Sequence, residues 1–279
     1  MHTRNKDNNI ILMIRLMLFI DQHLGQCSSS KKMGRPSKVT DLDVLTILLY
    51  DFLTEGHHHF KGIYNYIKRE YDDCFRLPSY QNFHAKVKKL LPLMESLLKD
   101  LLISQSSLIF VDSTPLPVCK PIRVKNFKVI KDKSLVGFTK NKAGWHFGFK
   151  LHLSINRSGL ITALGLTKAS CHDVNHLEAL LCESSKTIVG DSHYGGRPIV
   201  AKLKQRGIRI ISNAQNKDTR SSLENKLLAL RSKIESLFGL LKTKYGLMTS
   251  YARSYTGYKL HYIKTLLSYQ LSQLFKLAS

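Results

Sequence analysis

Two short apolar runs in this sequence each end in an aspartate. Leu108–Val111 leads into Asp112, and Thr187–Gly190 leads into Asp191. A short apolar run closed by turn residues predicts a buried strand, so each aspartate is expected where a strand ends, at the edge of a sheet. Functional sites are often built at such edges. Two carboxylates delivered in this way predict a metal site with oxygen ligands.

A third carboxylate is found in the last part of the chain. Arg231 precedes Glu235 by four residues and Lys242 follows it by seven, which predicts that all three share one face of a long helix. Taken alone, this spacing favours an ordinary surface ion pair between Arg231 and Glu235. Together with two strand-end aspartates, it favours Glu235 as a third metal ligand, with Arg231 and Lys242 beside it as phosphate contacts.

Three carboxylates in one place predict a particular chemistry. Two divalent ions held close together activate a nucleophilic oxygen and stabilise the leaving oxygen of a phosphodiester. Magnesium prefers hard oxygen ligands and keeps several waters, so a few carboxylates suffice to hold it. We therefore expect two Mg²⁺ ions bound by Asp112, Asp191 and Glu235, with Mn²⁺ as a possible substitute.

The charge of the chain predicts a polyanionic partner. The formal net charge is +23. Residues 1–104 hold 15 basic and 11 acidic residues, whereas residues 105–279 hold 28 and 9. Such a surface attracts nucleic acid; the alternative is a basic surface that is merely solvated. The candidates for DNA contact in the basic segment Pro115–Lys142, and beside Asp191, are Lys120, Arg123, Lys125, Lys128 and His193.

Residues 1–104 are expected to form an all-α N-terminal region. Ile10–Ile20 predicts a buried helix, because it contains Arg15 and is too short to span a bilayer. Thr40, with Asp43 three residues later, predicts the start of the next helix. Two interpretations of this region stay open: a helix-turn-helix type of DNA reader, or a helical cap that packs on the rest of the protein.

Residues 105–279 are expected to form an α/β domain. Strands are predicted at 108–111, 145–155, 160–167, 187–191 and 208–212, and helices at 173–181, 198–205, 223–245 and 258–277. This order favours a mixed sheet flanked by helices, as in a ribonuclease H-like (RNase H-like) domain. By analogy with that fold, the strands that lead into Asp112 and Asp191 lie side by side.

The blocks that carry these residues resemble those of DDE transposases, specifically the IS982 family of bacterial insertion-sequence transposases. The family pattern around the glutamate is Tyr, two residues, Arg, three residues, Glu, six residues, Lys; its tyrosine is Leu228 in this sequence. The resembling segments are Gly34–Lys38, Asp43–Leu49, Val111–Pro117, Gly144–His152, Gly190–Tyr194 and Arg231–Lys242. The resemblance implies an RNase H-like catalytic domain, magnesium dependence and recognition of terminal inverted repeats.

Other chemistry-bearing residues have simpler interpretations. The five cysteines form no CxxC pair, so they predict neither a zinc site nor a disulfide framework. The run His57–His59 is a weak metal candidate, since three adjacent residues of a helix cannot all face one ion. Asp173, after Cys171 and His172, is expected to cap a helix rather than support a nucleophile. Trp145 is expected in the core rather than stacked on a base.

The leading hypothesis is therefore a DNA transposase that hydrolyses phosphodiesters and transfers strands at insertion-sequence ends. Its partners would be double-stranded DNA, namely the terminal inverted repeats and the target, and by analogy a second copy of the chain, since two ends must be held together. No membrane partner is expected, and the location would be the bacterial cytoplasm, at the nucleoid. The alternatives are a structure-selective RNase H-like nuclease and a non-catalytic DNA-binding protein derived from a transposase.

Overall fold

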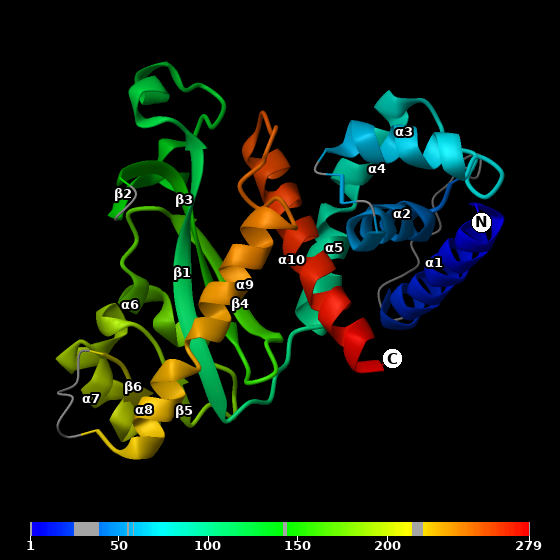
Figure 1. The fold of residues 1–279 in the computed structure, drawn as a ribbon. Helices are drawn as coiled ribbons and strands as arrows, with labels where there is room; N and C mark the ends of the chain where they lie inside the picture. The colour runs from blue at the N-terminus through cyan, green and yellow to red at the C-terminus, as the bar shows by residue number, and fades with distance from the viewer. Residues whose placement is uncertain are drawn as a thin grey trace. The chain divides into compact units, whose positions relative to one another are not determined.

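The computed structural model describes residues 2–24, 39–54, 56–57, 59–141, 144–213 and 220–278. The chain forms two compact units (Figure 1). A helical unit comprises Met1–Leu101 and Lys244–Phe275, and a sheet unit comprises Leu102–Thr243 and Lys276–Ser279. The domain boundary expected after residue 104 remains a prediction. The compact units differ from it at the C-terminal end, because most of the last helix packs with the N-terminal helices.

The helical unit is built from six described helices, and the predicted start of the second one is confirmed. Thr40 and Asp43 form reciprocal hydrogen bonds at 3.0 and 2.7 Å, so Thr40 caps the second helix as expected. Pro92 lies in the first turn of the fifth helix, where its missing N–H costs little. The helices are α1 (His2–Leu24), α2 (Asp41–Thr54), α3 (Phe60–Glu70), α4 (Tyr80–Lys89), α5 (Leu91–Asp100) and α10 (Tyr255–Ala278).

The apolar segment Ile10–Ile20 lies within α1, as predicted. One side of this helix, which includes Leu16 and Ile20, is fully buried, and its other side exposes Ile14 and Leu18. Among the described residues, no helix is both long enough and apolar enough to cross a membrane.

The sheet unit contains a mixed sheet of six strands flanked by helices, an arrangement consistent with an RNase H-like fold (Figure 1). The strand order is β2-β3-β1-β5-β6, and β4 pairs with the second half of β3, next to β2. The strands are β1 (Leu108–Cys119), β2 (Gly137–Asn141), β3 (Gly144–Ile155), β4 (Ile161–Lys168), β5 (Thr187–Val189) and β6 (Arg209–Ile211).

The predicted neighbourhood of the two aspartate strands is confirmed. β1 and β5 are parallel, with Ile109 opposite Ile188 and Phe110 opposite Val189. However, β1 does not end at Asp112. It continues to Cys119 along β3, so the expectation of a strand end at Asp112 was wrong. The prolines in β1 suggested an end. However, a proline, which has no N–H to donate, is tolerated in a strand at a position where no ladder hydrogen bond is needed.

The helices of the sheet unit also required corrections. The basic segment Pro115–Lys142 contains the end of β1, two 3₁₀ helices and β2. The long helix predicted at 223–245 is two helices that meet at Leu230 and Arg231. The elements are the 3₁₀ helices η1 (Pro121–Asn126), η2 (Lys133–Leu135), η3 (Leu177–Leu180) and η4 (Ser192–Gly195), and the α-helices α6 (Asp173–His176), α7 (Arg197–Gln205), α8 (Ser222–Ala229) and α9 (Ser232–Thr243).

Candidate active site

Three elements bring the predicted acids toward one another. Asp112 lies on β1 two residues beyond the last pair that β1 forms with β5. Asp191 follows β5 and caps η4, where one of its carboxylate oxygens accepts a hydrogen bond from the His193 N–H at 2.9 Å. Glu235 lies in the first turn of α9, a helix that packs against β1. Parallel pairing of β1 and β5 thus places both aspartates at the same end of these strands.

The pKa of Asp112 depends on the other two acids. Burial, together with the negative charges of Asp191 and Glu235, raises the pKa of Asp112 to about 6. The Ser113 N–H, which donates a hydrogen bond to the Asp112 carboxylate at 2.8 Å, and the Arg231 guanidinium act in the opposite direction. Asp191 and Glu235 therefore both lie within electrostatic reach of Asp112, and each repels its carboxylate.

Two cations from the predicted set lie with these acids. Arg231 forms an ion pair with Glu235, and its guanidinium also lies 3.9 Å from the Asp112 carboxylate. It belongs to the turn before α9 rather than to the helix itself. Burial lowers the pKa of the Lys242 ammonium, and attraction to Asp112 partly offsets this. Arg231, Glu235 and Lys242 thus gather at Asp112 although no single helix carries all three.

His193 lies beside Asp191, as the sequence predicted. Its Nδ1 lies 2.8 Å from the Asp191 carboxylate, and three quarters of its side chain are exposed. The hydrogen bond to Asp191 and the charge of that carboxylate raise the pKa of His193. An exposed imidazole whose charged form is favoured in this way is suited to meet a phosphate group.

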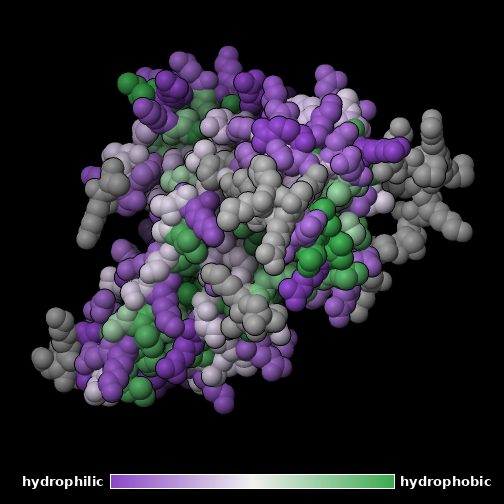
Figure 2. Space-filling model, turned by 45° about the vertical axis from the view of Figure 1, so that its right-hand side comes forward, coloured by the Kyte–Doolittle hydropathy of each residue, from purple (hydrophilic) through white to green (hydrophobic). Residues whose placement is uncertain are grey.

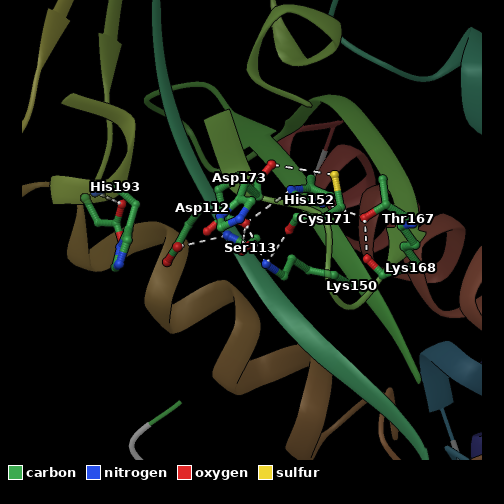
Figure 3. A network of polar contacts seen from close by, with 11 residues as sticks. Asp112, Ser113, Lys150, His152, Thr167, Lys168, Cys171, Asp173 and His193 are labelled. Atoms are coloured by element: carbon green, nitrogen blue, oxygen red, sulfur yellow. Dashed lines mark hydrogen bonds and ion pairs between the residues drawn. The ribbon is translucent and has the colours of Figure 1, made fainter. Parts of the chain in front are cut away.

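Behind Asp112, a buried polar network was not predicted from the sequence (Figure 3). Consecutive residues of a strand point to opposite faces. The Ser113 hydroxyl donates to Asp173 at 2.8 Å, and Lys150 Nζ donates to the same carboxylate oxygen at 3.1 Å. Lys150 also donates to the Cys171 carbonyl at 2.7 Å. This network holds the β1 backbone directly beside Asp112.

His152 completes the network on β3. It is fully buried, and it pairs across the strands with Ser113. Burial, then the neighbouring His176, lowers the pKa of His152 to about 4, so its ring is neutral at pH 7. The signal for this network was present in β3, where His146, Lys150 and His152 alternate with apolar residues. Polar residues on one face of a central strand require partners on that face.

Asp173 has a different role from the one expected. The N-cap of α6 is His172, whose side chain makes no capping hydrogen bond, and Asp173 lies within the first turn. Its carboxylate is the acceptor of the network described above. The prediction of a capping aspartate was wrong because the local pattern at a helix start does not reveal a partner such as Ser113, 60 residues away.

The basic segment lies apart from the acids. A strand rises about 3.3 Å per residue, so Cys119 at the end of β1 lies roughly 23 Å along the strand from Asp112. The four predicted contacts beyond it are all exposed, on or beside η1: Lys120, Arg123, Lys125 and Lys128. On the face drawn in Figure 2, hydrophilic residues prevail and hydrophobic areas are smaller. These three lysines and one arginine are available to a partner.

The remaining sequence candidates have local structural roles or remain outside the described residues. His57 bonds to the buried Asp51 at 2.6 Å, whereas His59 caps α3, so these two imidazoles serve different partners. Trp145 is 58% exposed, which corrects the expectation of a core residue. Its part of β3 pairs with β2 in an extension of the sheet. His58, Cys27 and Gly34–Lys38 lie outside the described residues.

The donor set fits hard divalent cations, because Asp112, Asp191 and Glu235 offer only carboxylate oxygens. Within the described part of the chain, no three His, Cys, Asp or Glu side chains are gathered around one point at ligand distances. Arg231 instead partly neutralises Asp112 and Glu235. Asp191 and Glu235 therefore act electrostatically on Asp112, and the Arg231 guanidinium lies beside both Asp112 and Glu235.

Comparison with known families gives one finding. A family model described as a transposase DDE domain matches residues 103–255. This span is more than half of the chain, and it contains Asp112, Asp191 and Glu235.

Proposed function

The chain belongs to the transposase DDE-domain family, and from this premise we propose that it is a metal-dependent DNA transposase of the IS982 type. It would cleave phosphodiesters at the terminal inverted repeats of an insertion sequence and join the ends to target DNA. The observation that carries the proposal is the electrostatic coupling of Asp112 to both Asp191 and Glu235, acids that lie 79 and 123 residues away in the chain.

In this proposal, Asp112, Asp191 and Glu235 hold two Mg²⁺ ions, or Mn²⁺ in their place. Bound ions of this kind activate a nucleophilic oxygen and stabilise a leaving oxygen. Arg231 and Lys242 then contact DNA phosphates beside the three acids, and His193 contacts the DNA strand near Asp191. The buried Ser113–Asp173–Lys150 network keeps β1 fixed, so that the position of Asp112 does not depend on the substrate.

The exposed cations on and beside η1 would hold the DNA farther from the reaction. Each phosphate that they neutralise contributes about 0.9 to the slope of log affinity against log salt concentration. Two ends have to be held together for transposition, so we propose a homodimer that acts on DNA at the nucleoid.

The test uses the full chain, a supercoiled plasmid that carries the DNA flanking its own gene, and either Mg²⁺ or EDTA. We expect Mg²⁺-dependent cuts at the flanking repeats and joined products, both absent with Glu235→Gln. Cuts without joined strands would identify a nuclease instead. Full cleavage by Asp112→Asn or Glu235→Gln would refute the assignment of the three acids, and loss of cleavage supports it when the variant melts no lower than the parent protein.

A further inference from the structure

The helical unit contains a cavity that the proposed chemistry does not use. Its volume is about 460 Å³, within the range of small-ligand sites in proteins. It is lined by the start of α3, by α4, and by the segment that leads into α10. All of these segments belong to the helical unit. The cavity is therefore a feature of one compact body.

Positive charge dominates the lining. The cavity is bordered by Lys61, Lys88 and Arg253, and none of its described lining residues is acidic. In the part of the chain that the structure describes, these three cations form no ion pair with a carboxylate. Unpaired cations around a hollow attract an anion. The first turns of α3 and α10 also reach the cavity, and their N-terminal N–H groups favour negative charge.

Aromatic rings provide the second part of the lining. Tyr80 and His84 lie one turn apart on α4 with their rings stacked, 5.8 Å between centroids and 21° between planes. Burial and the charge of Lys88 lower the pKa of His84, so this ring is neutral at pH 7. From the segment before α10, Tyr251 meets the edge of His59 at 6.0 Å and is 71% exposed. The cavity thus offers flat apolar faces beside its cations.

A ligand that satisfies both parts carries a phosphate and a flat ring. A nucleotide has both, and stacking of a base on an aromatic side chain does not depend on its sequence. In a duplex both faces of each base are covered, so a base enters such a cavity only after it leaves the stack. We propose that this cavity binds one unpaired nucleotide of a DNA strand, with its base against Tyr251 and its phosphate among Lys61, Lys88 and Arg253.

The inference rests on the proposed function in one respect: the polymer that supplies the nucleotide is DNA. It adds that the helical unit distinguishes distorted or single-stranded DNA from a perfect duplex. A free mononucleotide has the same chemistry, and the test separates the two sources.

The test measures equilibrium binding of the full chain in EDTA, by anisotropy of a labelled duplex that is either perfectly paired or carries a short bulge of unpaired adenines. We expect about tenfold tighter binding of the bulged DNA. Tyr251→Ala should abolish most of this preference, and Tyr251→Phe should retain it. Because Tyr251 is largely exposed, neither change should impair folding, which a melting curve checks.

The neighbouring lysines of α4 provide a matched pair. Lys88 borders the cavity, and Lys89 is exposed on the same helix outside it. Lys88→Gln should weaken binding of the bulged DNA more than binding of the paired DNA, whereas Lys89→Gln should weaken both equally. Equal affinity of the parent protein for the two DNAs, or an unchanged preference in Tyr251→Ala, would overturn the proposal.

Two further measurements separate the source of the nucleotide from the proposed catalysis. If dAMP displaces the bulged DNA at concentrations near the affinity of that DNA, the ligand is a free nucleotide and the assignment to a DNA strand fails. The second measurement is plasmid cleavage by the parent protein in Mg²⁺. If the parent protein prefers bulged DNA but does not cut the plasmid, the proposed function alone is refuted, whereas cutting without a preference would refute the cavity assignment alone.

Discussion

Replacement of Asp112 by asparagine should stabilise the metal-free protein while it removes the proposed activity. Burial, with repulsion from Asp191 and Glu235, raises the pKa of Asp112 from 3.8 to about 6. The folded protein therefore binds more protons than the unfolded chain between these pH values, and its stability falls as pH rises through this window. Above pH 6 the penalty is complete, and below pH 3.8 it is absent.

The size of the effect follows from the shift of about two pKa units. At about 1.4 kcal/mol per unit, the penalty is about 3 kcal/mol at pH 7.5 and roughly half of that at pH 5. Only 19% of the Asp112 side chain is exposed, so solvent screening reduces this little. Since about 1 kcal/mol moves the melting temperature of a protein of this size by roughly 2–4 °C, Asp112→Asn should melt up to about 6–12 °C higher at pH 7.5.

The assay is a thermal melt in EDTA and in excess Mg²⁺, at pH 5 and pH 7.5, for the parent protein, Asp112→Asn and a control, Asp132→Asn. Asp132 is an exposed acid near η2 that lies outside the site. In EDTA, Asp112→Asn should gain more at pH 7.5 than at pH 5. Mg²⁺ should stabilise the parent protein and the control but not Asp112→Asn. Lower stability of Asp112→Asn at pH 7.5, or equal stabilisation of all three by Mg²⁺, would refute the reasoning.

Two other substitutions and one fluorescence signal test separate parts of the molecule. Lys264 is fully buried, and burial lowers its pKa to about 7; stability should rise with pH from about 7 to 10.5, and Lys264→Met should raise stability at pH 7 by up to about 4 kcal/mol in urea unfolding. Gly190→Ala would place a Cβ 2.8 Å from the Tyr194 ring, so it should lower the melting temperature and abolish plasmid cleavage, and an active, stable variant would contradict this. Trp145 is the sole tryptophan and is 58% exposed; its fluorescence should change on DNA addition, with an apparent affinity that falls steeply with salt, and a flat salt response would contradict phosphate binding.

The sequence predicted the order of helices and strands because each element depends on a local pattern of residues. Apolar runs and the Thr40 cap depend on residues within a few positions of each other. The side-by-side placement of β1 and β5 was obtained from the fold analogy, and the structure confirms it. The continuation of β1 past Asp112 was missed, because the prolines in that stretch suggest an end unless the pairing of each edge is known.

The same division separates what could be predicted about the site. Asp112, Asp191 and Glu235 were chosen from their surroundings in the sequence, and in the structure Asp191 and Glu235 each act electrostatically on Asp112. The Ser113–Asp173–Lys150 network was missed, because its members come from β1, α6 and β3 and none shows a local pattern that names its partners. The cavity of the helical unit was missed for the same reason, since Lys88 and Arg253 are far apart in the sequence and line the same cavity only after folding.

The electrostatics of the sheet unit explain why Arg231 belongs to this site. Three acids that repel one another in a partly buried place would destabilise the fold if no cation were near. Arg231 supplies that cation from the turn before α9, where it reaches both Glu235 and Asp112. Any divalent ion that binds these carboxylates competes with the guanidinium for the same oxygens. Under the proposed function, metal binding would therefore release Arg231 toward the phosphate that the metals hold, so the residue that stabilises the acids without metal becomes a substrate contact once metal is bound.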